Sequence, residues 1–271
     1  MKSHVVAGGG GVPIYVVETG DEGAPPILFI HGFSQCSLIW SRQLSSNLAT
    51  RRRLVAIDLR GHGRSGKPRD AYGDSKCWAD DIHAVIETLG LDRPILCGWS
   101  YGPLVMLDYI RHYGEDRIGG LHFVDGVTKL GSEAATAVLG PEFLALVPGC
   151  LSDDAEVSVR SLEALARLFF VAELSPPDAY LMLGCAVMTP PHVRRALFSR
   201  PLDNDDVLSK LRKPVLITHG ANDRIVLPTA IDQHKARLPH AEIHLVQNTA
   251  HAPFWDAADE FNRRLEAFSG R

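Results

Sequence analysis

The feature that most constrains the fold of this chain is a serine flanked by two glycines, in the sequence GWSYG at residues 98–102. The apolar run at 94–97 is typical of a buried strand, and the apolar spacing at 104–110 is typical of a helix. A strand that turns directly into a helix brings the two elements very close, so glycines two residues before and two after Ser100 remove side chains that would collide. Such a turn lifts the serine hydroxyl above the sheet, where a histidine can reach it. The pattern predicts a nucleophilic serine, with an ordinary glycine-rich turn as the alternative.

Strand-like and helix-like patterns alternate along most of the chain. Strands are expected at 12–18, 26–30, 53–58, 94–97, 119–125, 215–219 and 241–247, and helices at 38–48, 78–89, 104–110, 229–238 and 254–268. This alternation predicts an α/β fold with a mostly parallel, doubly wound sheet covered by helices on both faces. Ligands of such sheets bind beyond the carboxyl ends of the strands, so we expect the functional residues there.

One segment, residues 126–206, breaks the alternation. It is rich in apolar patches, it is punctuated by paired prolines at 176–177 and 190–191, and it reads as helices and loops without a clear strand. We expect a helical lid, or cap, inserted into a core formed by residues 1–125 and 207–271. The segment leaves the core at the carboxyl end of a strand, which favours a lid over the alternative of helical padding on one side of the domain.

Composition limits the partners that this protein can have. The 271 residues are 45% hydrophobic and 22% charged, with a net charge of −4, as in an ordinary soluble domain with a sizeable core. An excess of acidic residues gives no basic surface for nucleic acid. No apolar run reaches the roughly 20 residues that span a bilayer, and the first residues lack the apolar stretch of a signal peptide. We therefore expect a small-molecule substrate, no nucleic acid and no membrane; the oligomeric state stays open.

The cysteines favour a cytoplasmic location. Cys36, Cys77, Cys97, Cys150 and Cys185 are widely spaced, odd in number and without a C-x-x-C pair. A disulfide framework or a zinc site is therefore not expected, and buried free thiols in a reducing compartment are the prediction. Because Cys36 lies near a candidate site loop, a reactive thiol at that position is the alternative.

A nucleophilic serine needs a base and an acid. An imidazole serves as the base because its pKa is near the working pH, and an acid fixes the imidazole's tautomer. Of the twelve histidines, His251 is the candidate, since it follows the last expected strand and precedes the final helix. Asp223, beyond the strand at 215–219, is the preferred acid, and Asp125, beyond the strand at 119–125, is the alternative acid.

An oxyanion hole needs backbone donors directed at the developing negative charge. One donor should be the N–H of Tyr101, the residue after the serine. The other should come from the loop after the strand at 26–30, and the N–H of Phe33 is the candidate. An ordinary turn at the end of that strand is the alternative for the second donor.

Five motifs in this order resemble the α/β-hydrolase superfamily. They are His31-Gly32-Phe33, Asp58-Leu59-Arg60-Gly61-His62-Gly63-Arg64-Ser65, Gly98-Trp99-Ser100-Tyr101-Gly102, Gly220-Ala221-Asn222-Asp223 and Ala250-His251. The chain is similar to the branch that holds small bacterial esterases, lactonases, C–C bond hydrolases and cofactor-free haloperoxidases. The resemblance implies an eight-stranded sheet, a Ser100-Asp223-His251 triad, and catalysis without cofactor or metal. Serine at the nucleophile position departs from the aspartate of haloalkane dehalogenases and epoxide hydrolases. Pro103, where relatives often carry a small residue, is a second departure.

The sequence therefore predicts a serine hydrolase that cleaves a small, largely apolar ester through an acyl-enzyme intermediate. C–C bond hydrolysis, lactone opening and perhydrolysis would use the same triad and remain alternatives. A small-molecule receptor built on a hydrolase scaffold is the alternative of another class. The candidates for the pocket walls are Trp40, Trp99, Tyr101, Phe169 and Met188. Packing in the hydrophobic core would explain each of these residues equally well.

Overall fold

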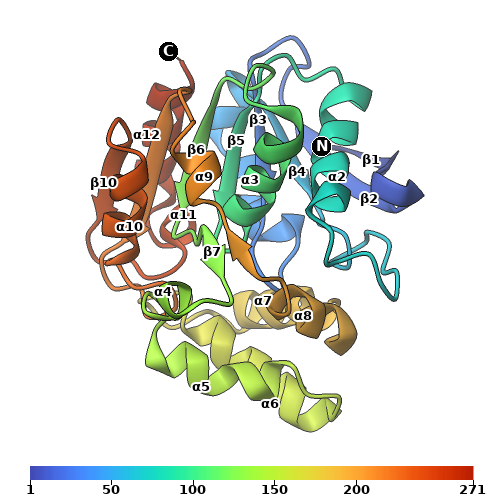
Figure 1. Ribbon diagram of the computed structural model, residues 1–271, viewed down its shortest axis with the longest axis vertical. Coiled ribbons are helices and arrows are strands. Elements are labelled where there is room, and N and C mark those ends of the chain that lie inside the picture. Colours follow the sequence, from blue (N-terminus) through green and yellow to red (C-terminus); the bar gives the residue numbers. More distant parts are fainter. Residues whose placement is uncertain (271) are drawn as a thin grey trace.

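The computed structural model describes residues 1–270, in which helices cover both faces of an eight-stranded sheet (Figure 1). The strand order is β1-β2-β4-β3-β5-β6-β9-β10. The strands are β1 (Lys2–Ala7), β2 (Pro13–Thr19), β3 (Pro26–Ile30), β4 (Arg53–Ile57), β5 (Ile95–Trp99), β6 (Gly120–Val124), β9 (Val215–Gly220) and β10 (Glu242–Val246). β2 runs antiparallel to both of its neighbours, and every other pairing is parallel. The predicted mostly parallel sheet is confirmed.

The first strand is the part of the sheet that sequence patterns did not predict. β1 pairs antiparallel with β2, and the four glycines at 8–11 form the tight turn between them. Gly10 and Gly11 have φ angles of 66° and 75°, a region that glycine enters without steric cost. The Gly9 N–H also donates a hydrogen bond of 2.8 Å to the carboxylate of Asp81. The glycine run is therefore a hydrogen-bonded hairpin turn.

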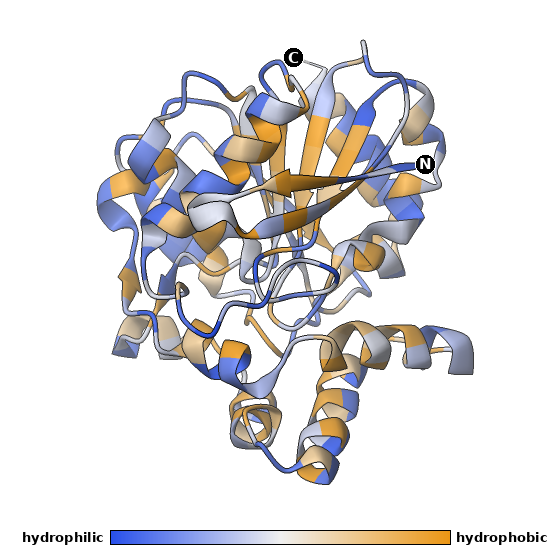
Figure 2. Cartoon of the chain, turned by 90° about the vertical axis from the view of Figure 1, so that its right-hand side faces the viewer, coloured by the Kyte–Doolittle hydropathy of each residue, from blue (hydrophilic) through white to orange (hydrophobic). Residues whose placement is uncertain are grey.

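The central strands are buried on both faces, which explains their continuous apolar runs. All five residues of β3, β4, β5 and β6 are buried, and Figure 2 shows these strands as the hydrophobic centre of the molecule. In β5, Gly98 faces the start of α3 (Gly102–Tyr113). Its neighbour Cys97 points the other way, towards His122, and the His122 ring stacks on Phe261 of α12 (Ala258–Ser269). Successive residues thus point to the two helical layers.

The helices of the core are α1 (Ser41–Leu44), α2 (Ser75–Thr88), α3 (Gly102–Tyr113), α9 (Asp205–Leu208), α10 (Ala230–Arg237), α11 (Pro253–Asp256) and α12 (Ala258–Ser269). Two predicted helices are interrupted. The segment 38–48 divides into short 3-10 turns around α1, and the segment 254–268 divides into α11 and α12. The second break lies at Ala257, whose φ and ψ of −127° and 51° are not helical. Apolar spacing continued across both breaks, so it could not locate them.

The insertion consists of five helices and lies at one end of the sheet (Figure 1). They are α4 (Glu133–Thr136), α5 (Pro141–Cys150), α6 (Ala155–Arg167), α7 (Pro176–Val187) and α8 (Pro191–Phe198). The second proline of 190–191 and the first of 176–177 stand at the first positions of α8 and α7, where a missing N–H costs nothing. Contrary to expectation, the insertion includes two short strands, β7 (Lys129–Leu130) and β8 (Leu202–Asp203), which pair where the chain leaves and re-enters the core.

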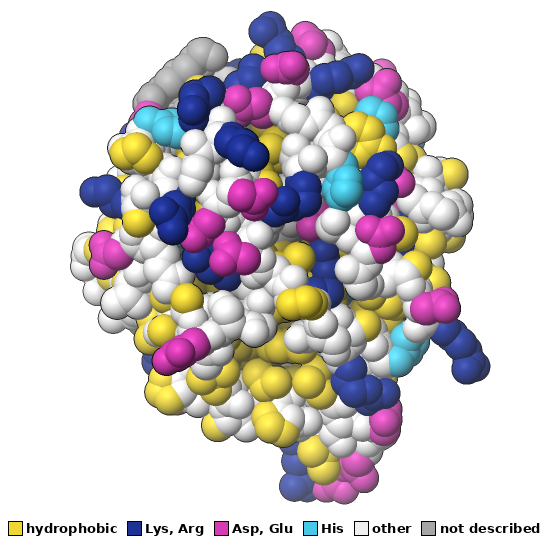
Figure 3. All heavy atoms as spheres, in the orientation of Figure 1, with side chains coloured by type: hydrophobic (Ala, Val, Ile, Leu, Met, Phe, Trp, Pro, Cys, Tyr) yellow, Lys and Arg dark blue, Asp and Glu magenta, His cyan; other side chains and the backbone are white. Residues whose placement is uncertain are grey.

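The outer surface of the insertion is partly apolar. Figure 3 shows hydrophobic side chains gathered on the lower half of the molecule, where the insertion lies. Exposed large hydrophobic residues of α5, α6 and α7 are Leu144, Val157, Val159, Tyr180 and Val187. Among the described residues, no helix combines the length and apolar character needed to cross a membrane.

Candidate active site

Ser100 occupies a strained turn between β5 and α3. Its φ is 57°, in the left-handed region that non-glycine residues rarely adopt. A methyl group at Gly98 would lie 2.3 Å from the sulfur of Met106 and 2.9 Å from the backbone of Gly102. A methyl group at Gly102 would lie 2.7 Å from the Ile30 carbonyl oxygen. Both glycines are therefore required by close approach, as the G-x-S-x-G spacing predicts, and the strain at the serine is held by the packing around it.

Pro103, the residue that departs from the pattern, is accommodated at the start of α3. The first turn of a helix has N–H groups without intrahelical partners, so a proline there removes no helical hydrogen bond. Its ring instead packs against Gly126, where an added methyl group would lie 2.5 Å from the Pro103 Cγ atom.

His251 lies in the loop between β10 and α11, and its Nδ1 is 2.8 Å from the Asp223 Oδ2 atom. Both side chains are buried. The other carboxylate oxygen of Asp223 accepts the N–H groups of Ile225 and Val226, at 2.8 and 3.1 Å. The acid therefore has a fixed orientation, and its hydrogen bond with Nδ1 leaves the Nε2 atom of His251 as the basic nitrogen.

The histidine loop is fastened to the strand that carries the serine. The indole N–H of Trp99, the residue before Ser100, donates a hydrogen bond of 2.6 Å to the backbone carbonyl of His251. The Trp99 ring also lies 5.2 Å from the imidazole, measured between ring centroids. The sequence indicated Trp99 only as a pocket wall or a core residue, whereas the structure shows that it ties the base loop to the serine turn.

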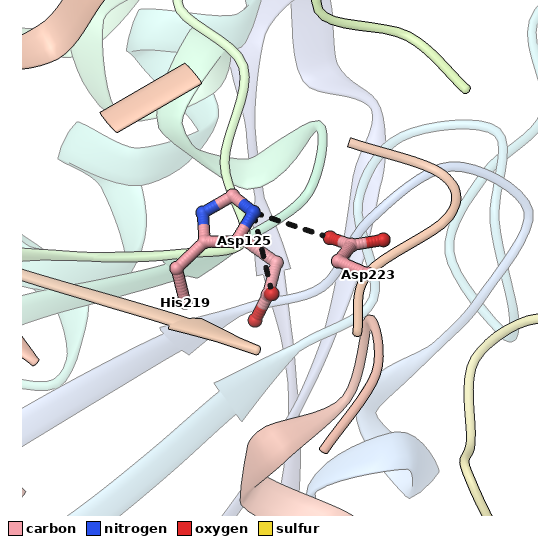
Figure 4. Close-up of side chains that lie close together, drawn as sticks. All are labelled: Asp125, His219 and Asp223. Atoms are coloured by element: carbon pink, nitrogen blue, oxygen red, sulfur yellow. Dashed lines mark ion pairs between the residues drawn. The ribbon is translucent and has the colours of Figure 1, made fainter. Parts of the chain in front are cut away.

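His219 and Asp125 stand behind Asp223, and Figure 4 shows one nitrogen of the His219 ring facing both carboxylates. His219 Nε2 lies 3.4 Å from Asp223 and 3.8 Å from Asp125. Burial alone would raise the pKa of Asp223, but the charge of His251 and the hydrogen bonds from His219 and His251 outweigh it and lower that pKa. Burial and the neighbouring charge of Asp223 raise the pKa of Asp125 well above its ordinary value. The pKa values of the two acids therefore shift in opposite directions, down for Asp223 and up for Asp125.

This arrangement favours Asp223 over Asp125 as the partner of His251. Asp125 Oδ1 accepts the backbone N–H of Gly220 at 2.8 Å, which places it beneath the acid loop. The acids follow β6 and β9, which are neighbours in the sheet, so both lie close to the base. The tertiary structure supplies the contacts that separate the preferred acid from the alternative.

The three side chains in Figure 4 also bring ligand-type atoms within 4.8 Å of one another, as a metal site would. Their hydrogen bonds indicate a role other than metal binding. His219 Nε2 lies 2.8 Å from the carbonyl oxygen of Val226, so this nitrogen carries a proton and cannot ligate a metal through its lone pair. The Asp223 Oδ2 atom is engaged by His251. The cluster is therefore suited to orienting the acid rather than to binding a cation.

The predicted oxyanion loop lies directly against the serine. A methyl group at Gly32 would be 2.7 Å from the Ser100 Cβ atom, so the segment leading to Phe33 passes over the turn. The Tyr101 carbonyl accepts the N–H of Leu104 at 3.1 Å and begins α3. Because a helix leaves its first N–H groups without intrahelical partners, the Tyr101 N–H is available to a ligand. The two proposed donors thus come from segments that meet at Ser100.

His31 shapes the oxyanion loop rather than acting on substrate. Its Nδ1 lies 2.8 Å from the Gly32 carbonyl oxygen, and its Nε2 accepts the Leu59 N–H at 2.9 Å. Burial lowers the pKa of His31 to about 4, so the ring is neutral and can both donate and accept. The second motif contributes Asp58, whose carboxylate accepts the N–H groups of Ser37 and Arg64, each at 2.7 Å. These motif residues hold two loops together at the ends of β3 and β4.

The candidate pocket residues fall into three groups. Trp40 is fully buried and packs on Phe29 and Phe254, with centroid distances of 4.8 and 4.3 Å, so core packing accounts for it. Phe169 lies 5.9 Å from the His251 ring and 5.2 Å from the Trp99 ring, beside the proposed triad. Met188 follows α7 and is exposed on the insertion.

A buried polar network that sequence analysis missed supports the serine turn from the other side. Arg200, between α8 and β8, donates hydrogen bonds to the Tyr101 hydroxyl at 3.0 Å and to the Asp108 carboxylate at 2.6 Å. Its guanidinium also lies 5.0 Å from the Trp78 ring centroid. Burial raises the pKa of Asp108 to about 6, although Arg200 opposes this shift. An isolated arginine in a predicted helical insertion gives no sign of such partners, which lie far away in the sequence.

Comparison with known proteins identifies the family of this chain. Residues 27–264 match the alpha/beta hydrolase family. The chain belongs to this family. Among alpha/beta hydrolases of known structure, an esterase from Rhodococcus sp. ECU1013 is 32% identical, with a TM-score of 0.92 and coverage of 100% of this chain and 99% of that one. A bifunctional esterase/perhydrolase of Acinetobacter calcoaceticus is 27% identical over 80% of each chain. A pimeloyl-[acyl-carrier protein] methyl ester esterase of Photorhabdus laumondii is 27% identical over 94% of this chain and 95% of that protein. The predicted fold and the predicted enzyme class, a hydrolase, are confirmed.

Proposed function

We propose that this hydrolase cleaves carboxylic esters of small, largely apolar compounds through a Ser100-His251-Asp223 triad. The observation that carries the proposal is the buried contact of 2.8 Å between His251 Nδ1 and Asp223, beside a serine held in a strained turn. The names of the relatives, among them two esterases and an esterase/perhydrolase, support ester chemistry.

In the proposed mechanism, His251 Nε2 takes the proton of the Ser100 hydroxyl, and the serine oxygen attacks the ester carbonyl. The N–H groups of Phe33 and Tyr101 stabilise the oxyanion, and His251 returns the proton to the leaving alcohol. Water, deprotonated by His251, then attacks the acyl-enzyme and releases the acid. Asp223 remains ionised throughout and stabilises the imidazolium that forms twice in the cycle.

Aromatic rings around the proposed triad support an apolar acyl or alcohol group. Phe169 and Trp99 border His251, and the Phe33 ring makes an edge-to-face contact with Phe198 of α8 at 5.0 Å. The insertion thus contributes rings next to both the base and the oxyanion loop. We propose that it serves as a lid whose side chains select the substrate.

A comparison of purified wild-type protein with Ser100→Ala tests the proposal. Short p-nitrophenyl esters provide the assay, and a fluorophosphonate probe reports covalent reaction at the serine. Loss of the nucleophile should reduce turnover by about 10⁶-fold and abolish labelling. Equal turnover in the two proteins would refute the triad.

The alternative reactions give different patterns in a wider panel. Labelling of Ser100 with no ester turnover, combined with turnover of lactones, of C–C substrates or of peroxide with a carboxylic acid, would replace ester hydrolysis by that reaction. If both proteins were inert and a small molecule raised the melting temperature of both, the receptor function would stand instead.

A further inference from the structure

Two buried thiols join the core to the insertion. Cys36 lies in the loop after β3, and Cys185 lies on α7, 149 positions later in the chain. The Cys36 thiol donates a hydrogen bond to the Cys185 sulfur, with 3.1 Å between the two sulfur atoms. The exposed fractions of the two residues are 2% and 3%. Neither thiol has a role in the proposed mechanism.

The sulfur contact belongs to a wider docking point between α7, α8 and the loop at 33–36. The side-chain amide of Gln35 donates to the Met182 carbonyl of α7 at 3.4 Å. Met182 and Cys185 are three residues apart on α7, so they share one helical face. Phe33 at the start of the same loop contacts Phe198 of α8. The loop that carries the proposed oxyanion donor is therefore the surface on which the insertion rests.

We propose that Cys36 and Cys185 form a reversible disulfide that fixes the insertion to the core, with hydroperoxides as the class of oxidant. A disulfide has an S–S distance of about 2.05 Å, so the sulfur atoms need to approach by only about 1 Å. Two S–H bonds break and one S–S bond forms. The two electrons and two protons reduce the O–O bond of ROOH to one alcohol and one water. Dithiols such as those of thioredoxin-like proteins reverse the step.

The surroundings of the pair determine its rate. The hydrogen bond with Cys185, together with burial, raises the pKa of the Cys36 thiol. Because the thiolate is the reacting form, the link should form slowly while the insertion rests on the loop. Proximity determines the product: whichever of the two thiols is oxidised first to a sulfenic acid meets the other sulfur at contact distance. Cys77, half-buried on α2, has no such partner among the described cysteines and supplies the internal control.

The functional consequence rests on the proposed function. Hydrolysis requires substrate to pass between the insertion and the core, so a link between α7 and the oxyanion loop should slow entry and release. The link also closes a loop of about 150 residues, which restricts the unfolded chain. We expect a melting temperature higher by about 5 °C or more and a value of kcat/KM for bulky esters lower by tenfold or more.

The test treats folded, full-length protein with a tenfold excess of cumene hydroperoxide for several hours and identifies linked peptides by mass spectrometry without reduction. The variants Cys36→Ala and Cys185→Ala remove the link, and Cys77→Ala is the matched control. The expected result is a Cys36–Cys185 peptide pair in wild type and Cys77→Ala, absent from the other two variants and reversed by dithiothreitol. Melting temperatures and ester turnover are measured on the same samples.

Complete oxidation of Cys77 without a Cys36–Cys185 pair would overturn the inference, as would random pairing among the five cysteines. A disulfide that changes neither the melting temperature nor the turnover would refute the proposal that it fixes the insertion to the core. If the wild-type protein hydrolyses no ester, the proposed function fails, while peptide mapping and melting still decide the link.

Discussion

Gly32 is the position where a single added methyl group should impair catalysis far more than folding. The methyl group of Gly32→Ala would lie 2.7 Å from the Ser100 Cβ atom and 3.2 Å from the carbonyl oxygen of Trp99. Ordinary contact begins at 3.4 Å, so the oxyanion loop and the serine must separate by about 0.7 Å. A displacement of that order between reacting groups typically costs about 10²-fold in rate. Gly32 has no positive φ, so alanine introduces a steric conflict rather than backbone strain.

We therefore expect kcat of Gly32→Ala for p-nitrophenyl acetate to fall between tenfold and a hundredfold. Overpacking costs about 1–3 kcal/mol, so the protein should remain folded. The matched control is Gly119→Ala, whose methyl group would lie 2.8 Å from the Arg93 carbonyl oxygen at the opposite end of the sheet. It should lose similar stability and keep its kcat. Wild-type kcat in Gly32→Ala, or an equal loss in Gly119→Ala, would show that the loop does not position an oxyanion donor.

Three further predictions concern buried titratable side chains. Asp223→Asn should reduce kcat by about 10⁴-fold because the amide cannot stabilise the His251 imidazolium. Asp125→Asn should change kcat only a few-fold, because Asp125 accepts the Gly220 N–H while Asp223 holds the His251 ring. Steady-state kinetics would contradict this if Asp125→Asn were the more damaged variant. Arg200→Met leaves the buried Asp108 unpaired, which costs about 3–5 kcal/mol and should lower the melting temperature by about 10 °C. Adding Asp108→Leu should restore most of this loss. An Arg200→Met variant as stable as wild type would contradict a stabilising role of the pair. Burial lowers the pKa of several histidines, to about 4 for His31 and to about 3 for His62, His122 and His234. Below about pH 6.5 the unfolded chain binds protons at these rings and the folded chain does not, so the free energy of unfolding should fall as the pH drops from 6.5 towards 4. Urea titrations at constant ionic strength measure this free energy. A flat profile would show that the buried rings are not neutral in the folded protein.

The regular elements of the core could be predicted because their causes are local. β3, β4, β5 and β6 are buried on both faces and need continuous apolar runs, and α2 needs an apolar stripe at helical spacing. β1 could not be found in this way, because it lies at the edge of the sheet and four of its six residues are exposed. Val6 is its one buried residue, so the strand carries almost no periodic signal.

The short strands β7 and β8 also escaped prediction. Each has two residues, and 71 residues of intervening chain separate Lys129–Leu130 from Leu202–Asp203. A window of local sequence contains only one partner of such a pair. The interruptions of the helical segments around Trp40 and Ala257 were also missed, because apolar spacing continues across both breaks.

By itself, the sequence determined the fold family, the serine turn and the histidine loop, because glycine spacing and strand ends depend on residues that are close together in the sequence. The sequence favoured Asp223 as the acid, but the contacts that separate it from Asp125 required the tertiary structure. β6 and β9 are neighbours, so the two acids end up side by side; Asp223 contacts His251, whereas Asp125 accepts the Gly220 N–H. Tertiary structure also decided which aromatic residues border the site: Trp40 and Trp99 look alike in sequence and both pack on Phe254, but the Trp99 ring also lies against His251. The contacts of Arg200 with Tyr101 and of Cys36 with Cys185 span 99 and 149 positions, and only folding brings such distant partners together.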